Sequence, residues 1–171
     1  MTSGANAPTG ASSKRQPMTV VWALLAVLLL VLFLTVDEGA RPILLKAVLV
    51  PTALGEALAF VSNSFRPRRF AEQNGRPYHP AFHGVMQDFG FYNLAFAGLL
   101  VLAAIDPGRS RVALGVVVAS YLVHALTHIF RYFGIYYGGG HPIPTRPRAF
   151  ELRDGLQLIA PAIGIVLFFP S

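Results

Sequence analysis

Two pairs of histidines stand four residues apart, in HPAFH at His79 and His83 and in HALTH at His124 and His128. Residues four apart share one face of a helix, so each pair could place two imidazoles on one metal ion. Neither pair has the glutamate after its first histidine that zinc proteases use as a general base, so that class is not expected. One face cannot supply both axial ligands of a haem, so a haem would need one histidine from each pair, such as His83 and His124.

Carboxylates near these histidines could complete a mixed site for Zn, Fe or Mn. Asp88, Glu151 and Asp154 are the candidates, because each lies beside an apolar segment. The predicted metal set is His83, Asp88, His124, His128 and Asp154. A polar pocket without metal is the alternative, in which three side chains would bind the head group of a lipid- or quinone-like molecule: Tyr92, Asn93 and Gln157.

The same residues also fit a structural interpretation. Amphipathic rings and long cations form belts at membrane surfaces, a pattern matched by His128, Arg131, Tyr132, Tyr136 and Tyr137. His124 would lie about 6 Å deeper than His128, one helical turn further into the membrane. Polar groups at that depth are costly, so His124 is the histidine that most needs a specific explanation. A polar contact between helices is favoured there over a metal ligand.

Composition indicates that the bilayer is the solvent. Of 171 residues, 54% are hydrophobic and only 13% are charged, whereas soluble domains carry about 25% charged residues. The net charge of +6 then reflects topology rather than nucleic-acid binding, for which the chain has no motif. The absence of cysteine excludes disulfides, cysteine-ligated zinc, iron–sulfur clusters and a thiol nucleophile.

Apolar runs predict an all-α integral membrane helical bundle of four or five transmembrane helices. Residues 1–17 form a predicted disordered tail, and residues 18–171 a single transmembrane domain. Clear spans of nearly 20 residues are expected at about 20–36, 89–105, 112–130 and 152–169. The short turn DPGRSR predicts an antiparallel hairpin of the second and third. Residues 42–61 could be a fifth span or lie in the interface, because this part of the chain carries Lys46, Pro51 and Glu56.

The basic residues divide ten against four in either arrangement. Since lysine and arginine collect on the cytoplasmic side and a basic flank before a first span normally stays inside, five spans are slightly favoured. Both arrangements place the loops 66–83 and 131–150, and with them all five histidines, at the cytoplasmic face of the cell membrane. RPRRF (residues 66–70) is expected to contact anionic lipid there.

Two stretches resemble small four-helix membrane families of the DoxX-like group. They are DFGFYNLAFAGLLVLAAIDP (residues 88–107), in which a polar aromatic FYN turn leads into an apolar helix, and RDGLQLIAPAIGIVLFF (residues 153–169), a final span with Gly-Leu before a proline. This resemblance implies a compact helical bundle with no assigned reaction.

Two functions are therefore expected as alternatives. The first is a non-enzymatic accessory subunit or a binder of a lipid- or quinone-like molecule, with membrane lipids and other membrane subunits as partners. The second is a membrane oxidoreductase or hydrolase that uses the His/carboxylate metal site or a b-type haem.

Overall fold

The computed structural model describes residues 17–74, 78–135 and 148–169. The predicted tail before Pro17, the belt residues Tyr136 and Tyr137, and His141 lie outside these ranges. The described residues form helices and contain no strand, which confirms the all-α fold class. The elements are α1 (Pro17–Thr35), η1 (Glu38–Ala40), α2 (Arg41–Phe65), α3 (Pro67–Gln73), η2 (Pro80–Phe82), α4 (His83–Ile105), α5 (Arg111–Tyr132) and α6 (Arg148–Phe168).

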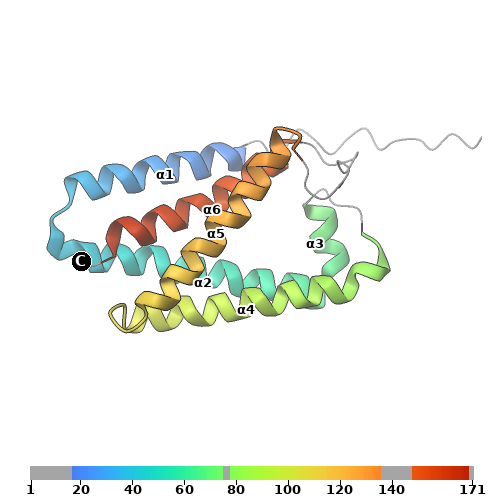
Figure 1. The fold of residues 1–171 in the computed structure, drawn as a ribbon, viewed down its shortest axis with the longest axis horizontal. Coiled ribbons are helices and arrows are strands. Elements are labelled where there is room, and N and C mark those ends of the chain that lie inside the picture. The colour runs from blue at the N-terminus through green and yellow to red at the C-terminus, as the bar shows by residue number, and fades with distance from the viewer. Residues whose placement is uncertain (1–16, 75–77, 136–147, 170–171) are drawn as a thin grey trace, which may run out of the picture.

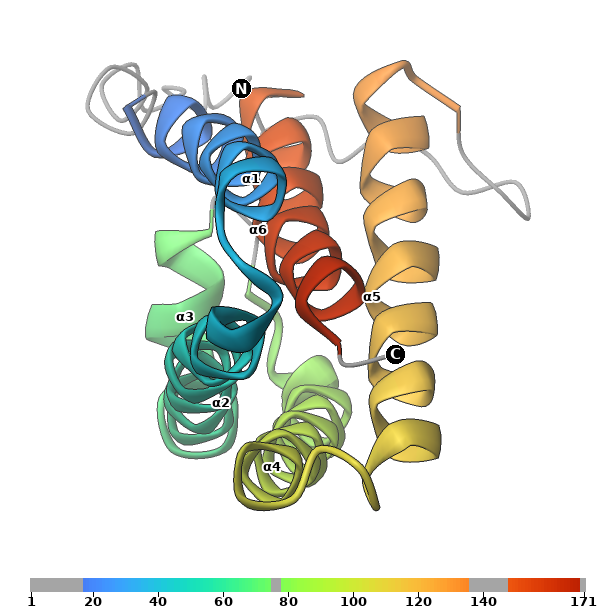
Figure 2. The ribbon, with the colours of Figure 1, turned by 90° about the vertical axis from the view of Figure 1, so that its left-hand side faces the viewer.

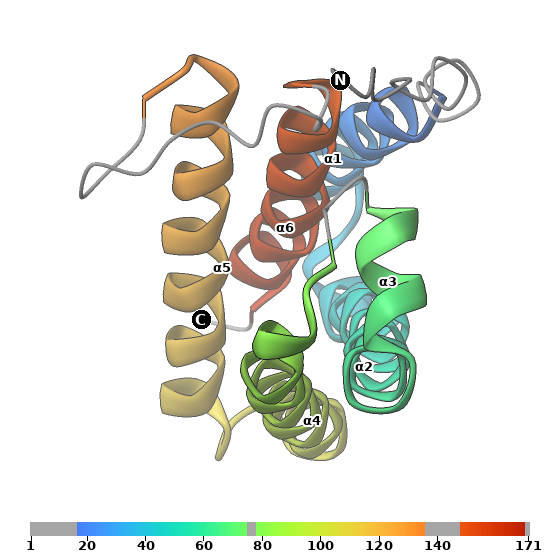
Figure 3. The ribbon, with the colours of Figure 1, turned by 90° about the vertical axis from the view of Figure 1, so that its right-hand side faces the viewer.

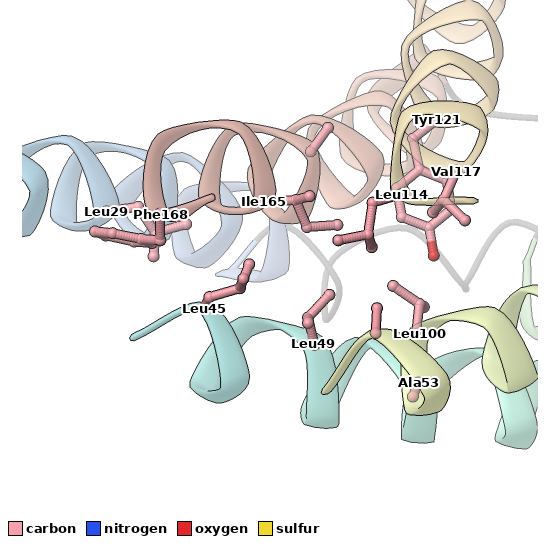
Figure 4. Packing of buried hydrophobic residues seen from close by; sticks show 12 residues of the cluster. Leu29, Leu45, Leu49, Ala53, Leu100, Leu114, Val117, Tyr121, Ile165 and Phe168 are labelled. Atoms are coloured by element: carbon pink, nitrogen blue, oxygen red, sulfur yellow. The ribbon is translucent and has the colours of Figure 1, made fainter. Parts of the chain in front are cut away.

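The helices form two layers (Figures 1 and 2). One layer pairs α2 with α4, and in the other α6 lies between α1 and α5 and also contacts α2. Buried side chains fill the space where the layers meet (Figure 4). The cluster consists of Leu29, Leu45, Leu49, Ala53, Leu100, Ala103, Leu114, Val117, Tyr121, Ala162, Ile165 and Phe168.

The helices on either side of the DPGRSR turn, α4 and α5, do not pack along their length as the predicted hairpin requires. Although α4 and α5 meet near their short connection, α4 packs mainly on α2 and α5 mainly on α6. From the connection, α5 runs steeply away from α4, so the start of α4 and the end of α5 lie apart (Figures 1 and 3). The sequence-based expectation that His83 and Asp88 face His124 across a hairpin fails for this reason.

Four segments are long and apolar enough to cross a membrane: Met18–Thr35, Glu38–Phe65, His83–Ile105 and Arg111–Tyr132. The uncertain segment 42–61 falls within the second of them. The predicted span 152–169 is not among them, although α6 runs the length of the bundle (Figure 1). Its first two turns carry four charged side chains: Arg148, Glu151, Arg153 and Asp154.

Successive long helices run in opposite directions along the bundle (Figure 1). Helix α2 passes from one end to the other, as the five-span alternative requires. The described basic residues near one end, which we call the arginine end, are Arg66, Arg68, Arg69, Arg131, Arg148 and Arg153; those near the other are Arg41, Lys46, Arg109 and Arg111.

Gly90 sets the close approach of α2 and α4. A Cβ at this position would overlap the hydroxyl oxygen of Ser64 and lie 3.3 Å from the carbonyl oxygen of Phe60. The Nε2 of Gln87 donates to the Ser64 carbonyl oxygen at 3.5 Å, one turn before the glycine. A larger residue would therefore have to turn the Ser64 hydroxyl away and push slightly on the backbone of α2.

Gly90→Ala should lower the free energy of unfolding by about 1–3 kcal/mol, the usual cost of overpacking. A denaturant titration in mild detergent would measure the change. Gly98→Ala is the matched control, because a Cβ there meets nothing within 4 Å and alanine favours the helix. Equal stability of Gly90→Ala and the wild type would contradict the proposed constraint.

Candidate functional site at the arginine end

A buried histidine–glutamate pair joins α5 to α6. The Nδ1 atom of His128 lies 2.7 Å from Oε2 of Glu151, and the two residues are only 2% and 7% exposed. A hydrogen bond between these groups is strong in a low dielectric, and it gives each of the two buried polar groups a partner. The pair therefore fastens the end of α5 to the start of α6.

Gly155 allows this approach, since it follows Glu151 by one turn of α6. A Cβ at Gly155 would lie 3.4 Å from the backbone oxygen of Ala125 and 3.6 Å from the Cβ of His128. The bare backbone of α6 thus rests directly on α5 beside the buried pair.

Burial reverses the expected roles of the two histidines on α5. His128 is predicted to lie in the interfacial belt, but its side chain is buried. His124 is predicted to make a polar contact between helices, but its side chain is exposed on the surface of the bundle. Their rings stack with centroids 4.8 Å apart. Position along a helix does not determine whether a side chain is buried. His128 is buried because it points at α6, whereas His124 lies at the edge of the same helix face.

The five predicted metal ligands are not brought together as one set, although His124 and His128 lie side by side. His83 is exposed at the start of α4, where its Nδ1 lies 3.1 Å from the Tyr78 hydroxyl, and Asp88 is exposed further along that helix. Asp154 accepts a hydrogen bond from Nε of Arg153 at 2.8 Å. Within the described ranges, no three His, Cys, Asp or Glu side chains lie close enough together to hold a metal ion.

Arg153 ties α3 to α6. Its Nη2 donates to the Oδ1 of Asn74 at 2.8 Å, and its guanidinium lies 4.7 Å from the ring centroid of Phe150. With Asp154 as its acidic partner, this arginine holds the short basic helix α3 against the bundle, which indicates a structural role for both residues.

The predicted head-group ligands are also separated. Tyr92 is exposed and, with Asp88, lines a hollow of about 590 Å³ on the outer surface of α4. Asn93 is half-buried on the same helix, whereas Gln157 is exposed on α6, which packs on α1, α2 and α5. These three side chains therefore do not form one binding site.

A cavity of about 720 Å³ lies at the arginine end, lined by residues of α1, of α6 and of the end of α5. We call it the α1–α5–α6 groove. Its lining residues are Thr19, Val20, Tyr132, Phe133, Arg148, Ala149 and Leu152. Leu152 directly follows Glu151, so the groove adjoins the buried pair. Sequence reasoning missed this site, because its walls come from distant parts of the chain and only Tyr132 carried a local signal.

Gly134 shapes one rim of the groove. Its φ of +82° is in the left-handed region, where glycine is favoured after a helix end. A Cβ there would lie 3.7 Å from Nη2 of Arg148, so the arginine reaches across from α6 to the end of α5.

No family model, curated protein or solved structure matches this chain. The resemblance to DoxX-like membrane families stays a prediction.

His128→Ala should lower the free energy of unfolding by about 3–5 kcal/mol, because it removes the histidine partner of the buried Glu151 carboxyl. His124→Ala, in the next turn of α5, should change it by less than about 1 kcal/mol, since the side chain is exposed. Denaturant titration of both variants in mild detergent measures the difference. A greater loss for His124→Ala would refute the assignment of roles.

Proposed function

We propose that the protein binds a lipid- or quinone-like amphiphile in the α1–α5–α6 groove. This proposal is based on the residues that line the groove. Arg148, Tyr132 and Thr19 offer hydrogen-bond donors, and Val20, Phe133 and Leu152 offer apolar surface. Binding sites for small molecules combine a mostly apolar lining with a few polar groups that fix orientation. A molecule with a polar head and a hydrocarbon tail matches both parts.

The size of the groove limits what it can enclose. About 720 Å³ is within the usual range for small-molecule sites, roughly 300–1,000 Å³, and suits a head group with the first part of a tail. The rest of the tail would follow α1, whose exposed apolar side chains continue away from Val20: Leu24, Val27, Leu28 and Val31.

The His128–Glu151 pair supports the site from behind. By fixing α5 against α6, it holds the groove in shape before the ligand arrives, which reduces the entropy lost on binding. Such a protein would act as a non-enzymatic accessory subunit when it presents the amphiphile to a neighbouring membrane protein.

We place the protein in the cell membrane as a multi-pass protein with the arginine end in the cytoplasm. The arginine-rich flanks of the helices support this orientation. Arg66, Arg68 and Arg69 are exposed beside or on α3, where each would gain about 1 kcal/mol from anionic lipid.

Ala149→Trp should abolish binding by filling the groove, and Arg148→Ala should weaken it about tenfold through loss of a charged hydrogen-bond donor. Native mass spectrometry of the detergent-solubilised protein with phosphatidylglycerol, and separately with a short-chain ubiquinone, would measure binding and distinguish the two ligand classes. Arg109→Ala is the matched control, an exposed arginine at the other end of the bundle. Unchanged binding of both probes by both groove variants would refute the site.

Because the chain has no cysteine, single cysteines can report its orientation. A membrane-impermeant maleimide added to intact cells should label Arg109→Cys and should label Arg69→Cys only after permeabilisation. The reverse pattern would place the arginine end outside the cell.

A further inference from the structure

A half-buried carboxyl group lies between α2 and α5, away from the arginine end. The hydroxyl of Tyr121 on α5 donates a hydrogen bond of 2.5 Å to Oε1 of Glu56 on α2. Tyr121 is 3% exposed, and the ring of Phe96 packs edge-on against it with centroids 6.0 Å apart. Along its helix, Glu56 lies about 14 Å from the end at Phe65, at 1.5 Å per residue. Both residues thus sit within segments long and apolar enough to cross a membrane.

The partner of this carboxyl group is an uncharged phenol rather than a cation. Ionised side chains are costly in the membrane interior, and acidic residues there are rare and often belong to proton relays. A hydrogen bond from tyrosine accommodates the glutamate whether or not it holds a proton, so the pair is suited to proton exchange.

The other titratable groups on α5 are separate from this pair. Tyr121 hydrogen-bonds Glu56 and packs against Phe96. Nearer the arginine end, His128 bonds Glu151 at 2.7 Å, and its ring stacks on His124.

We propose that Glu56 is a proton-binding site within the membrane. A proton from water adds to the Glu56 carboxylate while the Tyr121 hydroxyl keeps its own proton, so Glu56 changes between a carboxylate and a carboxylic acid beside the phenol.

The charged groups on the neighbouring helices lie away from the Glu56–Tyr121 pair. On α5, Arg131 follows His128 by one turn; on α6, Glu151 bonds His128 and Asp154 is held by Arg153. Helix α4 contributes the uncharged Phe96 at Tyr121, and its Asp88 is exposed near the start of the helix. On α2, Lys46 lies about 15 Å from Glu56 along the helix.

Infrared spectroscopy of the full chain in vesicles of neutral lipid tests the proton-binding site. A C=O stretching band of a protonated carboxyl should disappear in Glu56→Gln and persist in Glu72→Gln, which alters an exposed carboxyl on α3. Absence at every pH of a band that depends on Glu56 would overturn the proposal. Should Glu56→Gln not fold, labelling of wild-type Glu56 by an apolar carbodiimide, mapped by peptide mass, gives the same test: modified Glu56 supports the site and unmodified Glu56 overturns it.

Neither the infrared band nor the carbodiimide labelling depends on ligand binding in the α1–α5–α6 groove, so the two proposals fail separately.

Discussion

The packing of the bundle depends on α6, which lies against α1, α2 and α5 although its first two turns carry charged side chains. A charged helix start can be buried only if its side chains find partners, because isolated charges in an apolar interior are very costly. Glu151 meets His128 of α5, and Arg153 meets both Asp154 and Asn74. These contacts fasten α6 to α5 and to the segment that follows α2.

Glycines then decide which helices become neighbours. Gly155 brings α6 onto α5 and Gly90 brings α4 onto α2; further along α6, a Cβ at Gly164 would lie 2.8 Å from a methyl carbon of Val48 on α2. Close backbone approach increases packing contacts between apolar helices that gain little from leaving lipid. The chain therefore forms two layers instead of a hairpin between its sequence neighbours α4 and α5.

Helix α5 connects the two proposed activities. Its end contributes Tyr132 and Phe133 to the α1–α5–α6 groove, while its buried face carries Tyr121 and His128. The His128–Glu151 pair lies between these two regions of α5 and fastens the helix to α6.

The sequence by itself determined the helical class, because long apolar runs with little charge can satisfy their backbone in lipid only as helices or closed barrels. It also located α1 and α5 to within a few residues, located α4 apart from its first six residues, and placed the loops around 66–83 and the end of α5 at the same end of the bundle. Residue spacing assigned His124 and His128 to nearly the same side of one helix. Spacing does not say which neighbour that side meets, so only the tertiary structure decided that His128 is buried against Glu151. The same limit hid the contact of Glu56 with Tyr121, 65 residues apart, and the groove shared by Thr19 and Arg148, since such contacts follow from helix packing rather than from local pattern.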